Sequence, residues 1–407
     1  MSDAKIPKPL RKKSGNRRFW FRLHGFFSLP VWLLFCFVCL TGTIAVLSHE
    51  ITWLVNPAAR AENAQELPRQ PLPALVDAVT AKVPGAEVGN VMVLEPYLVT
   101  AVMFSTQDIP AGIAYVNPYT AEVQEIVQGI TFIGFMRSLH GWLLFPWQHA
   151  YSIGYYLVSA LSVLVIGALV TGLVVYRKFW RAFTQPRIRW RSDARTLLGD
   201  LHRHAGVWSL WFMLVIGLTG LWYLVQAVLW HNGIEYETET PPVAIADVPF
   251  AREGRPAPIA LAQALEQARL TLPELEPHWI SMPEHNRDYY TVYGSGGAFL
   301  FDDFSYRVQV NPWTGAVARS STPDGMGALE ILEHLADPLH YGTFGGLLTK
   351  TIWFVSGVVL SAMSVTGFFI WSKRTLKEAG HPPSRRRERR RRTRRAVPDT
   401  GAGEVSP

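Results

Sequence analysis

The chain has 407 residues, of which 49% are hydrophobic and only 17% are charged, and its formal net charge is +7. This balance is too apolar for an ordinary soluble chain of this size and is typical of membrane proteins. Composition therefore excludes a purely soluble protein and indicates that part of the chain lies in lipid.

Four stretches without acidic or basic side chains are long enough to cross a bilayer. A hydrocarbon core of roughly 30 Å needs about 20 residues of α-helix. In chain order the stretches are Gly25–Ser48, Ala150–Tyr176, Ala205–Trp230 and Thr351–Ser372. The first is not a cleaved signal peptide, because its apolar run is too long and no small-residue cleavage site follows it.

These stretches divide the chain into alternating membrane and connecting segments. Transmembrane helices are predicted over residues 23–49, 150–176, 204–230 and 351–372. Two large loops, 50–149 and 231–350, separate the first helix from the second and the third from the fourth. A basic segment 1–22, a basic loop 177–203 and an Arg-rich tail 373–407, predicted to be disordered, complete the chain.

The charges predict the orientation of these segments. The three shorter segments are basic. The segment up to Arg22 holds eight basic residues and one acidic residue, and the loop 177–203 holds eight basic and two acidic residues. The tail after Ser372 holds twelve basic and four acidic residues. The large loops are acidic, with nine acids and four bases over Glu50–Arg137, and sixteen and six over His231–His340. Basic segments near helix ends stay on the cytoplasmic side. We therefore expect a protein of the bacterial inner membrane with both termini in the cytoplasm and both large loops outside.

The Arg-rich tail has two possible readings. Runs such as Arg385–Arg387 and Arg389–Arg392 could contact nucleic acid. A polybasic segment beside a final membrane helix is more typical of a topology signal that contacts anionic lipid. We expect membrane lipid as its partner and no nucleic acid.

An internal repeat relates the two halves of the chain. Each helix combines a Leu-His pair with a Thr-Gly pair. In the first and third helices the His precedes the Thr by 17 residues: His24 and Thr41-Gly42, His202 and Thr219-Gly220. The second and fourth helices have a longer spacing: His140 and Thr171-Gly172, His340 and Thr366-Gly367. We attribute the Thr-Gly pairs to close helix packing.

The large loops repeat as well. Each begins with a helix-like run, Leu72–Val83 or Ile259–Leu270, and continues with short alternating runs that predict strands, such as Leu98–Phe104, Tyr289–Tyr293 and Phe299–Phe301. Each ends in Asn-Pro, an aromatic residue and Thr, at Asn117 and Asn311, which is turn chemistry between two strands.

This duplicated order resembles the PepSY domain and the PepSY-associated transmembrane family, also called iron-regulated membrane proteins, over about residues 18–375. The expected fold is a membrane protein with a four-helix transmembrane bundle built from two repeats and two extracytoplasmic α+β PepSY-like domains. Some members are similar in architecture to di-haem ferric-siderophore reductases. The resemblance thus implies reduction of ferric iron, or of a ferric-siderophore complex, on the periplasmic side.

The four repeated histidines are the candidate site. Histidine is costly at membrane depth, and neutral imidazole is a frequent axial ligand of haem iron. His24 and His202 each precede a helix that runs outward, so both lie near the cytoplasmic face. His140 and His340 lie near the outer face, ahead of helices that run inward. We predict that these two pairs bind the iron of two non-covalent b-type haems.

The outer pair needs breaks in the helices. Both histidines lie several residues before the uncharged core, so an unbroken helix would carry them above the membrane. Breaks are expected at Pro146, Gly342, Gly345 and Gly346. His204 could replace His202, and His49, His149 or His231 could replace His140 or His340. Interface histidines with no ligand are the alternative for all of them.

Two haems stacked across the membrane imply one-electron transfer. Cys36 and Cys39 have C-x-x-C spacing but lie in an apolar helix, which is typical of ordinary buried thiols. No nicotinamide or flavin site is recognisable, so quinol or a separate reductase is the expected donor. The alternatives are a membrane-anchored PepSY module that regulates a protease or another partner, and a permease component for haem or iron. No catalytic residue is predicted.

Overall fold

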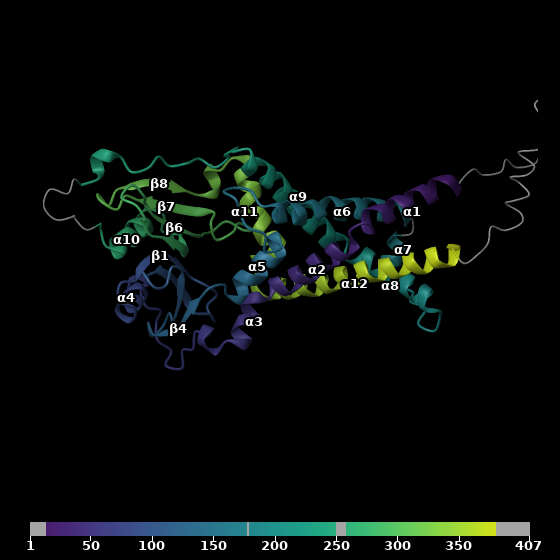
Figure 1. The fold of residues 1–407 in the computed structure, drawn as a ribbon, viewed down its shortest axis with the longest axis horizontal. Coiled ribbons are helices and arrows are strands. Elements are labelled where there is room, and N and C mark those ends of the chain that lie inside the picture. The colour runs from purple at the N-terminus through teal and green to yellow at the C-terminus, as the bar shows by residue number, and fades with distance from the viewer. Residues whose placement is uncertain (1–13, 177–178, 250–257, 380–407) are drawn as a thin grey trace, which may run out of the picture.

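The computed structural model describes residues 14–176, 179–249 and 258–379. Figure 1 shows a helical bundle that is joined at one end to a sheet-containing region. We call the end of the bundle next to the sheet the sheet-side end. The opposite end, where α1 and the last turns of α12 lie, is the terminal-side end. The Arg-rich runs between Arg385 and Arg392 lie outside the described residues.

Among the described residues, three helices are long and apolar enough to cross a membrane. They are α6 (Ile153–Val175), α9 (Leu210–His231) and α12 (Gly346–Ala379), the last with its span over Thr343–Ser372. A fourth crossing results if α1 (Ser14–Ser28) and α2 (Trp32–Val46), bent by 58°, are counted together. The bend contains Pro30, a residue that cannot continue a helix without a break. These helices agree with the membrane class that the composition predicts.

The long helices pack around a shared apolar interior. Helix α6 packs against α1 and α9, and α12 packs against α2 and α8 (Ala194–Trp208), while the short α7 (Phe179–Thr184) lies against α8. The buried centre is formed by Val165, Leu169, Phe212, Met213, Trp353 and Leu360. Large apolar side chains such as Leu157, Val170, Leu218 and Val355 remain exposed on the outside. An apolar outer surface is what a lipid environment requires.

The two large loops build one eight-stranded antiparallel sheet, in the order β4-β3-β2-β1-β5-β6-β7-β8. The first loop supplies β1 (Glu87–Met92), β2 (Thr100–Ser105), β3 (Gly112–Val116) and β4 (Val123–Gln128). The second supplies β5 (Glu276–Ser281), β6 (Tyr290–Ser295), β7 (Tyr306–Val310) and β8 (Val317–Ser321). The halves meet where Val91 of β1 pairs with Ile280 of β5.

Helices α4 (Leu72–Lys82) and α10 (Leu261–Thr271) cover one face of this sheet. Leu75 and Val79 of α4 and Ala264 of α10 pack on strand residues such as Val102 and Val308. Alternate strand residues, including Met103 and Tyr293, face the opposite side, toward the bundle. The sheet is therefore apolar on one face and lines a cavity with the other.

The predicted Asn-Pro turns are present between β3 and β4 and between β7 and β8. The side-chain oxygen of Asn117 accepts from the backbone N–H of Tyr119, and that of Asn311 accepts in the same way from Trp313. The predicted strand Phe299–Phe301 is wrong, because Leu300 has φ 68°, a left-handed conformation that a strand excludes.

Three shorter helices connect the sheet to the bundle: α3 (Ser48–Val55), α5 (Phe132–Trp142) and α11 (Ala328–Tyr341). Helix α5 packs against α2 and α6, and α11 against α9. Both end in left-handed residues, Leu143 (φ 54°) and Gly342 (φ 72°), and Gly346 is also left-handed (φ 60°). The expected break at Gly342 is confirmed, and a Cβ there would lie 2.6 Å from Trp353 Cγ. These breaks place the ends of α5 and α11 beside the bundle.

Candidate functional site

Each of the four repeated histidines contacts the Thr of a Thr-Gly pair on another helix. The Nδ1 to Oγ1 distances are 3.0 Å for His24 and Thr171, 3.3 Å for His140 and Thr41, 3.2 Å for His202 and Thr366, and 2.8 Å for His340 and Thr219. The first and second membrane segments thus exchange contacts with each other, and the third and fourth do the same. These contacts were not predicted from the sequence, although the recurrence of a Leu-His pair and a Thr-Gly pair in every helix was a signal for them.

The surroundings of the rings determine which nitrogen carries the proton. Nδ1 of His24 lies 3.1 Å from the carbonyl of Ala168, and Nδ1 of His140 lies 3.1 Å from that of Val38. A carbonyl only accepts hydrogen bonds, so Nδ1 is the protonated nitrogen in both rings.

In His202 and His340 the neighbouring threonines indicate that Nδ1 again carries the proton. Thr366 donates its own proton to the carbonyl of Ala362 at 2.8 Å, and Thr219 donates to Val215 at 2.8 Å. Their oxygens are therefore free to accept from Nδ1–H of His202 and His340. In all four rings Nε2 keeps its lone pair, which is the state that binds metal.

The glycine after each Thr gives three of the rings room. A Cβ at Gly42 would lie 2.6 Å from Cε1 of His140, closer than real contacts allow. A Cβ at Gly172 or Gly367 would lie 3.5 Å from His24 or 3.3 Å from His202. Gly220 differs, because its nearest neighbour is Ser162 on α6. The Thr-Gly pairs therefore serve close packing, as the sequence predicts, and part of that packing is against histidine.

The histidines form two pairs, one at each end of the bundle, and the ring geometry is known for the pair at the sheet-side end. The rings of His140 and His340 have centroids 6.2 Å apart and planes inclined by 36°. Two imidazoles on one metal ion, each bonded at about 2 Å, place their centroids roughly 6 Å apart. His24 and His202 are close enough to interact electrostatically. The structure brings together the residues that the sequence analysis paired.

This donor set fits a haem. Within the described ranges, no three His, Cys, Asp or Glu side chains gather in a way that could hold a bare metal ion. Two imidazoles such as those of His140 and His340 would hold the iron of a haem, which would supply one-electron chemistry at this site. The fit is tested here by the ring spacing and by the free Nε2 atoms of His140 and His340.

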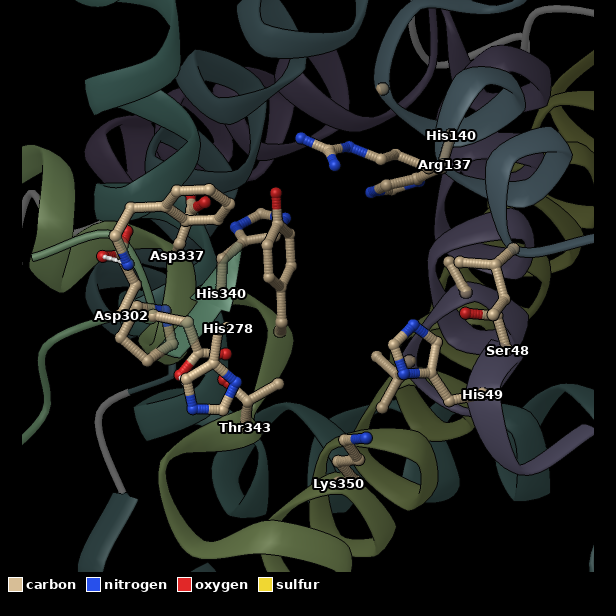
Figure 2. Close-up of a pocket in the computed structure, with 18 of the residues that line it drawn as sticks. Ser48, His49, Arg137, His140, His278, Asp302, Asp337, His340, Thr343 and Lys350 are labelled. Carbon is tan, nitrogen blue, oxygen red and sulfur yellow. Dashed lines mark hydrogen bonds and ion pairs between the residues drawn. The ribbon is translucent and has the colours of Figure 1, made fainter. Parts of the chain in front are cut away.

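A cavity of about 1980 Å³ surrounds the sheet-side pair and runs from the sheet into the bundle as far as Gly357 and Leu360. Its volume is about twice that of a large small-molecule pocket, so a macrocycle and a second ligand both fit. Figure 2 shows Arg137 and His140 on one wall of this cavity and His340 and Asp337 on another.

Helix α11 makes the His340 wall acidic. Asp337 accepts a hydrogen bond from Tyr223 at 2.7 Å, and Glu333 accepts one from Gln226 at 3.0 Å. Burial raises the pKa of Glu333 to about 7 and that of Asp337 to about 6. Both carboxyl groups can therefore hold a proton near neutral pH, next to the predicted site.

The other candidate histidines have different partners. His204 is buried, but its Nε2 donates to the carbonyl of Arg187 at 3.1 Å. His49 donates to Glu95 at 2.5 Å, and His231 lies 3.2 Å from the hydroxyl of Tyr156. His149 is exposed. The structure therefore gives none of these four the threonine contact shared by the predicted ligands.

Comparison with known protein families identifies a relationship that covers most of the chain. The family model described as the PepSY-associated TM region matches residues 11–374. None of the curated proteins matches the chain.

Proposed function

The chain belongs to the PepSY-associated transmembrane family, and from that premise we propose that it is a di-haem electron-transfer protein of the bacterial inner membrane. His24 with His202, and His140 with His340, hold one b-type haem each. The substrate is ferric iron or a ferric-siderophore complex on the periplasmic side, and the donor is quinol or a separate reductase.

The observation that carries this proposal is the fourfold contact between His and Thr. A structural histidine at a helix interface needs a partner for its polar atoms, but it does not need the same partner in four places. Here Nδ1 always faces a threonine hydroxyl, so Nδ1 has the same kind of partner in all four rings. A fixed outer hydrogen bond is the usual way to orient a metal-binding imidazole.

The arrangement of the halves supports the same proposal. We infer a four-helix bundle built from two repeats, because His–Thr contacts are exchanged within each half whereas the facing histidines come from different halves. Strands β1 and β5 also share one burial pattern, as do β2 and β6. Each proposed haem site therefore forms only when the two halves assemble.

The proposed orientation places the sheet outside the cell membrane. The sheet and its connections carry the acidic loops, and the described parts of the basic segments, 14–22, 179–203 and 373–379, lie at the terminal-side end. The His140 and His340 pair then faces the periplasm and opens into the large cavity.

A haem with two imidazole ligands accepts and releases one electron at a time. The protein supplies the rest: helices fix the rings, threonines fix their protonated nitrogens, and the apolar interior around Phe212 and Leu360 excludes water. The acidic groups of α11 can exchange protons beside the outer pair.

Purified protein tests the proposal directly. A preparation in mild detergent should show a strong Soret band and dithionite-sensitive α and β bands, with two haems per chain. His24→Ala or His202→Ala should remove about one haem equivalent, and His140→Ala or His340→Ala should remove the other, because each site loses one of two axial ligands. His204→Ala, at a buried histidine outside both pairs, is the control. A stable, colourless preparation from cells rich in haem would instead favour a membrane-anchored binding module.

A further inference from the structure

Arg137 differs from the other cations of the sheet-side cavity. Of those in the described residues, Lys350 pairs with Glu50 and Glu95, Arg307 pairs with Glu237, and Arg69 lies over the ring of Tyr119. Arg137 lines the same cavity and, within the described part of the chain, has no carboxylate within 4.0 Å. Asp337 is near enough to interact with Arg137 electrostatically, but it forms no direct ion pair with it. A cation that enters a cavity without a direct ion-pair partner indicates that an anionic group of a ligand fits there.

The position of Arg137 relates it to the histidine pair. It precedes His140 by three residues on α5, so both side chains leave the same face of the helix. In Figure 2 the guanidinium reaches into the opening on the His140 side, across from Asp337. Asp337 and Glu333 make the facing wall acidic. An anionic group in this cavity is therefore attracted toward the guanidinium on α5.

We propose, on the basis of the proposed function, that Arg137 binds a propionate of the haem held by His140 and His340 and so determines which edge of the macrocycle faces the cavity. Protohaem carries two propionate groups, and a guanidinium is the side chain best suited to bind a carboxylate through two hydrogen bonds.

Esterified haem gives a direct test, because haem dimethyl ester lacks the propionate charge. Wild-type and Arg137→Gln proteins are loaded with either compound, in the full-length chain and in a His24→Ala background that lacks the terminal-side haem. The readout is the rate of haem transfer to excess apomyoglobin. Arg69→Gln is the matched control for an arginine elsewhere in the cavity. Asp337→Asn tests whether Arg137 acts instead through the opposite carboxylate.

In wild type, esterification should accelerate haem loss about tenfold, the effect of removing one charge-assisted hydrogen bond. Arg137→Gln should accelerate the loss of haem by a similar factor and should not respond further to esterification. Arg69→Gln and Asp337→Asn should keep the wild-type discrimination between the two compounds. If Arg137→Gln binds too little haem to measure, Arg137→Glu decides the question, because it should hold the ester better than haem.

Two results would overturn the inference. Wild-type discrimination in Arg137→Gln, or a preference for haem in Arg137→Glu, would show that Arg137 does not bind the propionate, while the haem site itself would stand. Failure of every variant and of wild type to bind any haem at His140 and His340 would overturn the proposed function as well.

Discussion

At each predicted ligand, one threonine hydroxyl performs two tasks. Thr219 donates to the carbonyl of Val215 in its own helix and can accept from His340. The first bond keeps the hydroxyl proton inside α9, so the oxygen faces the ring with its lone pair. A valine has nearly the same shape but cannot accept a hydrogen bond, and it therefore isolates this contact.

Thr219→Val should weaken haem binding at the sheet-side end. It leaves Nδ1–H of His340 buried without its acceptor, which costs about 1–3 kcal/mol. We expect haem loss from this site to accelerate about tenfold and its midpoint potential to shift, while the terminal-side haem is unchanged. Haem transfer rates and a spectroscopic redox titration measure both effects.

Two matched variants complete this test. Thr219→Ser retains the hydroxyl and should restore both the rate and the potential. Thr52→Val removes a buried hydroxyl that donates to Ser48 in α3 and contacts no histidine, so it should change neither quantity. Identical potentials in Thr219→Val and wild type would show that the threonine serves packing alone.

A charged network joins the sheet to the bundle. Lys350, which is 8% exposed, donates to Glu95 at 2.6 Å and to Glu50 at 3.0 Å. His49 donates to the other oxygen of Glu95, and Tyr97 donates to Glu50. Burial alone would raise the pKa of Glu95, but His49 and Lys350 outweigh burial and lower it to about 2. The network thus connects α12, α3 and the β1–β2 connection.

Lys350→Met should destabilise this junction at neutral pH. It leaves two partly buried carboxylates without their lysine, while Glu95 keeps its contact with His49, so the free energy of unfolding should fall by roughly 3 kcal/mol, the lower end for a buried pair. The pKa of Glu95 lies below the ordinary value of 4.5, so its ionised form stabilises the wild-type protein above about pH 4.5. That contribution is lost as the pH falls toward 2, and the gap between variant and wild type should narrow over the same range.

Thermal unfolding in detergent at pH 7 and at pH 3 measures this difference. Lys82→Met, at an exposed lysine on α4, should behave like wild type at both values. A difference in stability that is the same at both pH values would mean that the methionine destabilises by packing and not by removing the positive charge beside Glu50 and Glu95.

The helices and strands of this fold were largely predictable from the sequence, but which of them pair or pack together was not. Apolar runs predicted the long helices, and alternation predicted most strands, because both patterns are local. Nothing local to Val91 or Ile280 shows that β1 and β5 pair, which merges the two loops into one sheet. Pro30 could have predicted the bend between α1 and α2. The apolar residues on both sides of it instead indicated one continuous helix.

Across the whole molecule, the sequence indicated which residues belong to the candidate site, but it did not indicate which side chains they contact. Repetition singled out His24, His140, His202 and His340, and the rings of His140 and His340 do lie close together. It did not show that each ring meets a threonine or that Arg137 enters the cavity. The bonds of Lys350 join residues 300 and 255 positions apart. Such contacts depend on the packing of helices, which the spacing within one helix does not determine.

The last prediction concerns the direction of electron flow. If the sheet lies outside, as the charges indicate, the His24 and His202 pair receives electrons near the cytoplasmic face and the His140 and His340 pair releases them into the cavity. In oriented vesicles that hold reduced protein, a membrane-impermeant ferric chelate should therefore reoxidise the haems from the sheet side and not from the terminal side.

His24→Ala separates delivery from release in the same vesicles. The variant lacks a ligand on the donor side, so electrons from the native donor should arrive more slowly. Once the remaining sheet-side haem is reduced chemically, the chelate should reoxidise it at the wild-type rate, because the cavity and its ligands are unchanged. Reoxidation from the terminal side alone, or an unaltered rate from the native donor, would contradict this direction of transfer.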